Sequence, residues 1–309
     1  MKNGFAAIVG GVNVDIGGRS FAPLISRDSN PGRLSVSLGG VGRNVAHNLA
    51  LLGVRTELIT ALGGDIWAEE IRKSCSALGI GLSRAVSAPG EPSSTYLYIS
   101  GPDGDMALAL CDMDIIRRVT PEVVEKNLDL LNSASLVVID GNLPAETVEA
   151  VCSLVSAPIF ADPVSVTKAE KFMPVLSKLY AIKPNALEAE ALTGESVPIR
   201  AAEALVRLGV KAAFVSDGAR GMAAADRDGS HLLPALPADT VNATGGGDAA
   251  MAGIAAAYLD GLGLLPAARF ALAAGAVAVE SFETINPAMS RGAILNKLKE
   301  YDFGGKAYE

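Results

Sequence analysis

Short apolar runs alternate with longer helical patterns along most of the chain. The runs predict strands over residues 5–9, 56–61, 136–140, 159–162, 180–183 and 212–216. Several of them are apolar throughout, as strands that are buried on both faces of a sheet usually are. The stretches between them predict helices over residues 43–52, 67–78, 145–155 and 201–208. Strands and helices that alternate in this way are typical of an α/β fold with a doubly wound, mainly parallel sheet.

Two stretches break this alternation, because their apolar residues recur at every second position. Leu34, Val36 and Leu38 alternate with serines, and residues 95–100 lead through a Gly-Pro-Asp-Gly turn into a second run at residues 106–110. Such strands have one solvated face, and the second stretch is a predicted hairpin. We expect a small β-sheet to be inserted beside the main sheet, as a lid that is able to cover a site at the carboxyl ends of the main sheet's strands. Its segments are expected at residues 14–39 and 92–113, within a single domain that spans residues 1–309.

Composition narrows the choice of partners. Half of the 309 residues are hydrophobic and 19% are charged, which is typical of a globular protein with a large core. The 26 Lys and Arg residues against 34 Asp and Glu give a net charge of −8. Because the chain has no overall positive field, it is not expected to bind nucleic acid or an anionic membrane surface. Any anionic ligand must be held by local groups.

Cysteine usage and the length of the apolar runs indicate the compartment. Cys75, Cys111 and Cys152 form no CxxC pair, which argues against a disulfide framework and favours a reducing compartment. Glycines at positions 10 and 11 interrupt the first apolar run, and the apolar stretch 249–259 is too short to cross a bilayer. We therefore expect a cytoplasmic protein without a membrane segment.

The strongest chemical signal is the sequence Thr-Gly-Gly-Gly-Asp at residues 244–248, which leads into a strongly helical run. Gly245, Gly246 and Gly247 would let the backbone approach an anion closely, and N–H groups at a helix start stabilise negative charge. Asp248 falls in the first helical turn, where a carboxylate could accept a proton from an alcohol that attacks a phosphoryl group. The alternative is an ordinary acidic residue at a helix start after a plain glycine turn.

The same segment also matches the dinucleotide-binding pattern GxGxxA through Gly245, Gly247 and Ala250. That motif needs a buried strand directly before it, whereas residues 238–243 are mixed and polar. A dinucleotide site is therefore not favoured. The chain contains no P-loop, HExxH helix or GxSxG elbow, and two histidines are too few for a histidine-based metal cluster.

A second glycine-rich group, Gly-Gly-Val-Gly-Arg-Asn at residues 39–44, precedes a helix that is predicted from residue 45. Asn44 can both donate and accept hydrogen bonds, so this group would suit a sugar hydroxyl. Asn13 and Asp15 follow the first strand, at the edge where open parallel sheets bind ligands. An Asn-x-Asp sequence at a strand end is often just a turn.

Two later groups also follow predicted strands. In the run Lys-Pro-Asn-Ala-Leu-Glu, a helix from Pro184 would place Asn185 and Glu188 on one face, where they could hold a phosphate and hydrated Mg²⁺. A helix cap is the alternative. Ser216, in the run Ser-Asp-Gly-Ala-Arg-Gly, enters a tight turn at Gly218. The amides of that turn could meet phosphates, or the turn could be a plain hairpin.

Together and in this order, these groups resemble the ribokinase-like family of carbohydrate and nucleoside kinases over nearly the whole chain. The resemblance implies a ribokinase-like α/β domain with a β lid, ATP and Mg²⁺ as cofactors, and transfer of the γ-phosphoryl group to a primary alcohol of a sugar. Asp248 then matches the catalytic base, and the amides of residues 245–247 match the anion hole. The positions that match substrate-binding residues are Asn13, Asp15, Gly40, Gly42 and Asn44. The positions that match the nucleotide side are Asn185, Ser216, Gly218 and Gly221, with Glu188 on the Mg²⁺ side.

Three details refine this resemblance. Family members that a monovalent cation activates commonly carry Asp where this chain has Asn242, and residues 281–287 also differ, so the resemblance does not extend to potassium activation. Residues 28–32, 111–115 and 286–287 are similar to those of nucleoside kinases, and Asp28 and Asn30 would offer hydrogen bonds to a uracil edge. The exposed edges of the lid strands could pair with a second copy, and members of the family often dimerise through their lids. We therefore expect a homodimer through the lid.

The residues themselves leave other functions open. A kinase for uridine, inosine or adenosine would need the same groups, and so would a kinase for ribose or fructose. A sugar-binding regulator without catalytic activity could be built on the same fold, although an intact Asp248 argues against it.

Overall fold

A nine-stranded sheet runs through the centre of the computed structural model, which describes residues 4–300. The strand order is β15-β14-β13-β12-β11-β10-β1-β4-β6, and the seven strands from β13 to β6 are parallel. The antiparallel strands β14 and β15 extend one edge. The strands are β1 (Phe5–Val9), β4 (Arg55–Ile59), β6 (Ile80–Gly81), β10 (Leu136–Asp140), β11 (Ile159–Asp162), β12 (Ala181–Ile182), β13 (Ala212–Ser216), β14 (Met222–Asp226) and β15 (Gly229–Leu233).

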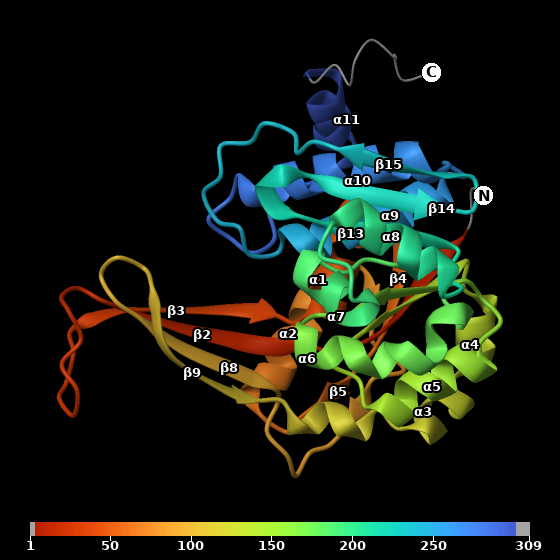
Figure 1. Cartoon of the computed structure of the whole chain (residues 1–309). Helices are drawn as coiled ribbons and strands as arrows, with labels where there is room; N and C mark the ends of the chain where they lie inside the picture. Colours follow the sequence, from red (N-terminus) through yellow and green to blue (C-terminus); the bar gives the residue numbers. More distant parts are fainter. Residues whose placement is uncertain (1–3, 301–309) are drawn as a thin grey trace.

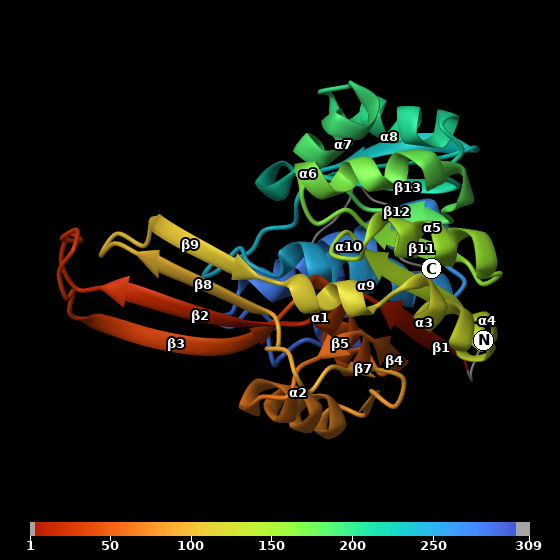
Figure 2. The ribbon, with the colours of Figure 1, turned by 90° about the horizontal axis from the view of Figure 1, so that it is seen from below.

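Helices cover both faces of this sheet (Figures 1 and 2). Alternate residues of each strand point to opposite faces, so Ala6 and Ile8 belong to one buried cluster while Ala7 and Val9 belong to the other. The first face is covered by α1 (Val41–Leu51), α2 (Ile66–Ala77), α9 (Gly246–Leu259), α10 (Leu264–Val279) and α11 (Arg291–Glu300). The second face is covered by α3 (Pro121–Lys126), α4 (Leu128–Ser133), α5 (Ala145–Leu154), α6 (Val166–Ala169), α7 (Ala186–Thr193) and α8 (Pro198–Arg207), with 3₁₀ helices at Asp114–Arg118 and Glu170–Lys178.

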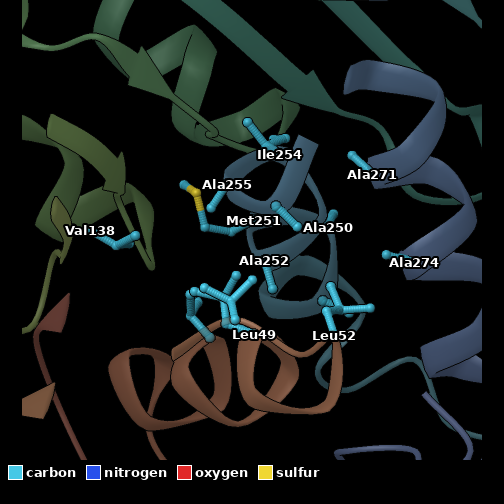
Figure 3. Close-up of a cluster of buried hydrophobic side chains, with 14 of the residues drawn as sticks. Leu49, Leu52, Val138, Ala250, Met251, Ala252, Ile254, Ala255, Ala271 and Ala274 are labelled. Atoms are coloured by element: carbon cyan, nitrogen blue, oxygen red, sulfur yellow. The ribbon is translucent and has the colours of Figure 1, made fainter. Parts of the chain in front are cut away.

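Helix α9 is apolar all round, because it is buried between α1, α10 and the sheet. Small side chains permit this packing, and a Cβ on Gly253 would lie only 3.0 Å from the Cα of Ala271 in α10. Figure 3 shows Met251 and Ala252 of α9 close to Leu49 of α1. The start of α9, where Asp248 lies, is therefore held by a tightly packed core.

The lid is a separate four-stranded sheet that projects from the main body (Figures 1 and 2). Its order is β3-β2-β8-β9, formed by β2 (Asn13–Ser20), β3 (Gly32–Gly39), β8 (Thr95–Ser100) and β9 (Met106–Asp112). Beside its base, β5 (Ala61–Leu62) pairs with β7 (Val86–Ser87). The predicted hairpin and the alternating strand are both confirmed. The expectation of a single solvated face is wrong for β3, because Leu34 and Val36 are exposed as well as the serines between them: no other part of residues 4–300 covers this end of the lid.

The structure corrects several boundaries. Helix α1 begins at Val41, not at residue 43 or 45, so Gly42 and Asn44 lie inside its first turn. Helix α7 begins at Ala186, not at Pro184. The strand that was predicted over residues 56–61 is interrupted at Thr60, and β14 and β15 were not predicted. No strand precedes α9 directly, in keeping with the rejection of a dinucleotide motif. Among residues 4–300, no helix combines the length and apolar character that a membrane crossing requires.

Candidate active site

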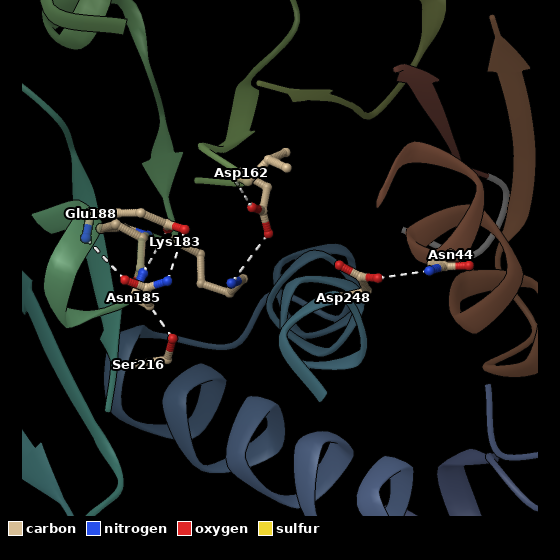
Figure 4. Close-up of polar contacts among 9 residues, drawn as sticks. Asn44, Asp162, Lys183, Asn185, Glu188, Ser216 and Asp248 are labelled. Carbon is tan, nitrogen blue, oxygen red and sulfur yellow. Dashed lines mark hydrogen bonds and ion pairs between the residues drawn. The ribbon is translucent and has the colours of Figure 1, made fainter. Parts of the chain in front are cut away.

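Polar side chains converge where the parallel strands end and where α1 and α9 begin. Asp140 ends β10, Asp162 ends β11 and Lys183 follows β12. Asp248 enters from the first turn of α9 (Figure 4). Carboxyl ends of parallel strands are where open α/β sheets bind ligands, and this edge collects most of the residues that the sequence singled out.

Asp248 is at the centre of this group. Its Oδ2 accepts a hydrogen bond from Nδ2 of Asn44 at 2.9 Å, which joins the starts of α9 and α1. The pKa of Asp248 is raised to about 7, mainly by burial and also by the nearby carboxylate of Asp162, while Asn44 and Lys183 act in the opposite direction. A carboxylate with a pKa near neutrality is suited to accept a proton at physiological pH.

The first of the three glycines before Asp248 has a backbone that other residues would not adopt easily. Gly245 has a φ of +83°, and a Cβ there would collide with the carbonyl oxygen of Thr284. Helix α9 starts at Gly246, so the first N–H groups of the helix have no partner within it, although the N–H of Gly246 donates to the carbonyl oxygen of Ala243 at 3.4 Å. We call residues 245–247 the anion loop. These glycines lie at the N-terminus of a long buried helix, where backbone N–H groups favour an anion, and the anion cradle stays a prediction.

Lys183 is a functional candidate that sequence reasoning missed. Its buried ammonium group lies 3.2 Å from Oδ2 of Asp162, and a Cβ on Gly247 would lie 3.5 Å from its Nζ. Burial by itself would lower the pKa of Lys183, but the surrounding carboxylates together raise it, so the group stays charged. A positive charge beside the anion loop can stabilise a phosphoryl group. The available signal was a lysine directly after a buried strand, at the edge where ligands bind.

Asn185 and Glu188 form a reciprocal cap at the start of α7. The backbone N–H of Glu188 donates to Oδ1 of Asn185 at 2.9 Å, and Asn185 donates to both carboxylate oxygens of Glu188, from N at 2.9 Å and from Nδ2 at 2.8 Å. The cap that the sequence offered as an alternative is thus present. Glu188 is buried, and this burial raises its pKa. Its carboxylate also interacts electrostatically with Lys183 and Asp162. A nucleotide or metal role for the pair stays a prediction.

Ser216 lies next to this cap, since its backbone pairs with Asn185 and its N–H donates to the carbonyl oxygen of Pro184 at 3.0 Å. The residues after it form a short 3₁₀ turn at Gly218–Arg220, which connects the antiparallel strands β13 and β14. This is the hairpin that the sequence also allowed. A Cβ on Gly221 would collide with the carbonyl oxygen of Leu233, so the turn needs this glycine for its own structure. Phosphate contacts from Gly218 and Gly221 remain predictions.

The other side of Asp248 is made by the base of the lid and the start of α1. A Cβ on Gly40 would lie 2.5 Å from the Cα of Val12, so this glycine brings α1 against the residues that precede the first lid strand. There Nδ2 of Asn13 donates to Oδ1 of Asp15 at 2.6 Å. Burial raises the pKa of Asp15, whose half-buried carboxylate remains able to accept hydrogen bonds. The structure therefore brings the five predicted positions of this side together.

Asp140 is a second residue that the sequence did not reveal. Its Oδ2 accepts hydrogen bonds from the N–H groups of Gly11 and Gly42, both at 2.8 Å, and its Oδ1 accepts one from Asn142 at 2.8 Å. One buried carboxylate thus ties the end of β1 to the first turn of α1. This contact fixes the position of Asn44 relative to the sheet.

Asp28 and Asn30 are not part of this arrangement. Both lie in the exposed loop at the outer end of the lid, between β2 and β3 (Figure 1). The amide of Asn30 is used within that loop, where it accepts from the N–H of Ile25 at 2.8 Å and donates to the carbonyl of Ile25 at 2.9 Å. The structure does not bring these two residues to Asp248, and contact with a base remains a prediction.

The donor set suits a hydrated magnesium ion better than a metal cage made by protein alone. Within residues 4–300, no three acidic, histidine or cysteine side chains converge closely enough to hold a metal ion by themselves. Glu188 and Asp162 nevertheless offer hard carboxylate oxygens near Lys183, whose ammonium group lies beside the anion loop. Mg²⁺ usually keeps several waters and binds through one or two carboxylates plus substrate phosphates, so these residues fit that ion.

Known proteins resemble this chain over nearly its whole length. The model of the pfkB family carbohydrate kinases matches residues 5–291. A pseudouridine kinase of Escherichia coli K12 is 32% identical over 299 residues, which cover 94% of this chain and 96% of that kinase. An uncharacterized sugar kinase of the same strain, YeiI, is 35% identical over 293 residues, which cover 93% and 81%. The structure of a carbohydrate kinase from Agrobacterium tumefaciens has a TM-score of 0.86 at 26% identity and covers 96% of this chain and 97% of that one.

Proposed function

Because this chain belongs to the pfkB family of carbohydrate kinases and is an ATP-dependent phosphotransferase with an alcohol as acceptor, we propose that it phosphorylates the 5′-hydroxyl of pseudouridine. The product would be pseudouridine 5′-phosphate. The observation that carries the proposal is the position of Asp248. On one side it binds Asn44, a residue expected to contact the acceptor, and on the other side lie the buried Lys183 and the anion loop. The identity with a pseudouridine kinase over nearly the full length of both chains supports the choice of acceptor.

The mechanism is direct in-line transfer. Asp248 accepts the proton of the attacking hydroxyl, and Asn44 orients its carboxylate. The N–H groups of the anion loop and the ammonium group of Lys183 stabilise the charge on the phosphoryl group as it moves. Closure of the lid over the bound acceptor would exclude water and so prevent hydrolysis of ATP. No covalent enzyme intermediate is needed, since the hydroxyl attacks ATP itself.

We propose that Glu188, with Asp162 nearby, holds Mg²⁺ through its waters together with ATP. When bound, the ion neutralises phosphate charge and polarises the phosphoryl oxygens. Asn185 orients the carboxylate of Glu188 through the two hydrogen bonds that it donates. Burial favours the protonated form of Glu188, whereas the hydrogen bonds from Asn185 favour the carboxylate that the ion would need.

The lid supports the proposal of a homodimer, although through a face and not through an edge. Leu34, Val36, Leu108 and Leu110 lie on the same face of the four-stranded sheet, and Leu34 and Leu110 are 78% and 64% exposed. A second copy would present the same face, so a two-fold pair of lids would bury these side chains against one another. A cytoplasmic location, which cysteine usage favours, is likewise a proposal.

A sugar kinase is the second candidate. The relative YeiI is as similar to this chain as the pseudouridine kinase is. In addition, Asp28 and Asn30, the residues expected to contact a base, lie far out on the lid. If neither residue reaches the acceptor, a free sugar such as ribose or fructose would find the same hydroxyl-binding groups.

The test is ATP consumption with a panel of acceptors: pseudouridine, uridine, inosine, adenosine, ribose and fructose. The proposal predicts the highest kcat/KM for pseudouridine. A clear preference for ribose or fructose would favour the sugar kinase, and a preference for another nucleoside would reject the choice of base. The absence of ATP consumption with every acceptor would leave a sugar-binding regulator as the alternative.

A further inference from the structure

Asn242 connects the two segments that support the anion loop. It lies in the stretch between β15 and α9, two residues before Thr244. Its Oδ1 accepts a hydrogen bond from the N–H of Thr244 at 3.0 Å, and its Nδ2 donates to the carbonyl oxygen of Phe282 at 3.1 Å. Because a backbone N–H can only donate, the first contact fixes which end of the amide faces Phe282.

Phe282 belongs to the segment 281–287, which follows α10 and lies directly behind the anion loop. Its neighbour Thr284 is the residue whose carbonyl oxygen a side chain on Gly245 would strike. The backbone N–H groups of Val241 and Asn242 both donate to the carbonyl oxygen of Val279 at the end of α10, at 2.8 and 3.2 Å. The position of the anion loop thus depends on how the stretch around Asn242 is joined to the end of α10 and the segment behind it.

A carboxylate at position 242 would produce a different site. Its second oxygen would face the carbonyl oxygen of Phe282 at about hydrogen-bond distance, where two acceptors repel each other. A bound cation would have to lie between them. The amide of Asn242 supplies an N–H at this point and adds no charge, so the residues present do not fit a monovalent cation.

We propose that Asn242 is a positioning residue whose uncharged side-chain amide joins Thr244 to Phe282 directly, so that this site needs no monovalent cation. Phosphoryl transfer by this chain therefore proceeds without potassium. The inference rests on the kinase activity but not on the identity of the acceptor. In this proposal, the neutral side chain of Asn242 holds the anion loop against residues 281–287.

The activity test compares potassium, sodium and tetramethylammonium chloride at constant ionic strength, with the best acceptor found. The wild type is expected to keep the same kcat/KM in all three salts. N242D is expected to lose at least about tenfold in tetramethylammonium, since a small displacement of a catalytic loop is costly, and to regain activity in potassium. The matched control N296D makes the same charge change at an exposed position on α11 and is expected to remain indifferent to the cation.

A melting experiment gives a readout that does not depend on any acceptor. Potassium, compared with tetramethylammonium, should raise the Tm of N242D by about 2 °C or more, and should leave wild type and N296D unchanged. If N242D is unfolded in tetramethylammonium, its refolding when potassium is added would equally support the proposal. A wild type that requires potassium, or an N242D variant that ignores the cation in both experiments, would overturn the proposal. Failure of the pseudouridine assignment would leave the melting comparison unaffected.

Discussion

The groups on the two sides of Asp248 differ in their chemistry (Figure 4). On one side, Asn44, Asn13 and Asp15 present amides and one carboxylate at glycine turns. On the other side, Lys183, Asp162 and Glu188 form a dense buried group of charges. Asp248 belongs to both, since Asn44 binds it directly and Lys183 and Asp162 shift its pKa.

This difference explains what can be inferred about each ligand. Buried charges beside a glycine loop and a helix N-terminus are suited to phosphate and a divalent cation, whatever the acceptor is. Amides and a single carboxylate suit hydroxyls in general, so the acceptor side alone indicates a sugar or nucleoside without naming it. Variants on the two sides should therefore separate catalytic rate from acceptor affinity.

The largest effect is expected for Asp248→Asn, which removes the base and keeps the size of the side chain. Turnover should fall by at least about two orders of magnitude, within the range for loss of a general base. Binding of ATP and acceptor, measured by calorimetry, should be preserved. Turnover close to that of the wild type would reject Asp248 as the base.

Lys183→Met, on the charged side of Asp248, should give the next largest loss. We expect kcat to fall about 100-fold, as for removal of one donor to the transition state, while the KM of the acceptor stays nearly constant. Lys183→Arg keeps the charge and serves as the matched control, with partial activity. If both variants melt earlier and retain kcat, Lys183 has only a structural role beside Asp162.

Asn44→Ala should act on the pH dependence. In the wild type, kcat/KM should fall as the pH decreases through about 7, because Asp248 becomes protonated and can no longer act as a base. Asn44 lowers the pKa of Asp248, so its removal should move this acid limb to higher pH. At pH 6 we expect roughly tenfold lower kcat/KM than in the wild type, from loss of a hydrogen bond to a charged group. An acid limb that stays in place would separate Asn44 from Asp248.

The smallest effect on chemistry is expected on the lid. Leu110→Asp should convert a dimer into a monomer in sedimentation experiments, because a charge would be buried between two apolar faces. Leu232→Asp, at a similarly exposed position on β15, is the matched control and should change nothing. A wild type that sediments as a monomer would reject the dimer.

Local sequence was sufficient for much of the fold and for the centre of the site. Strands such as residues 136–140 are short, continuous apolar runs, and Asp248 follows glycines at the start of a helix that α1 and α10 bury. These features are encoded within a few neighbouring residues. The start of α1 was placed too late, because Gly40 and Gly42 resemble a loop until their contacts with Val12 and Asp140 are known.

Contacts between distant segments could not be predicted. Lys183 acquires its role from Asp162, on the neighbouring strand, and from Gly247, which lies 64 residues later in the chain. Asp140 joins Gly11 to Gly42 across the sheet, although nothing in its own sequence neighbourhood marks it. The same reason explains Asp28 and Asn30, whose polar character is evident in the sequence but whose distance from Asp248 depends on the length of the lid strands.

The product of the reaction tests the account most directly. Wild-type enzyme, ATP, Mg²⁺ and pseudouridine should be followed by ³¹P nuclear magnetic resonance. We predict the growth of a phosphomonoester signal coupled to the two 5′ protons, in equal amount to ADP, and no such signal with Asp248→Asn. Formation of inorganic phosphate in place of the ester, or an ester on a different hydroxyl, would contradict transfer to a 5′-hydroxyl held against Asp248.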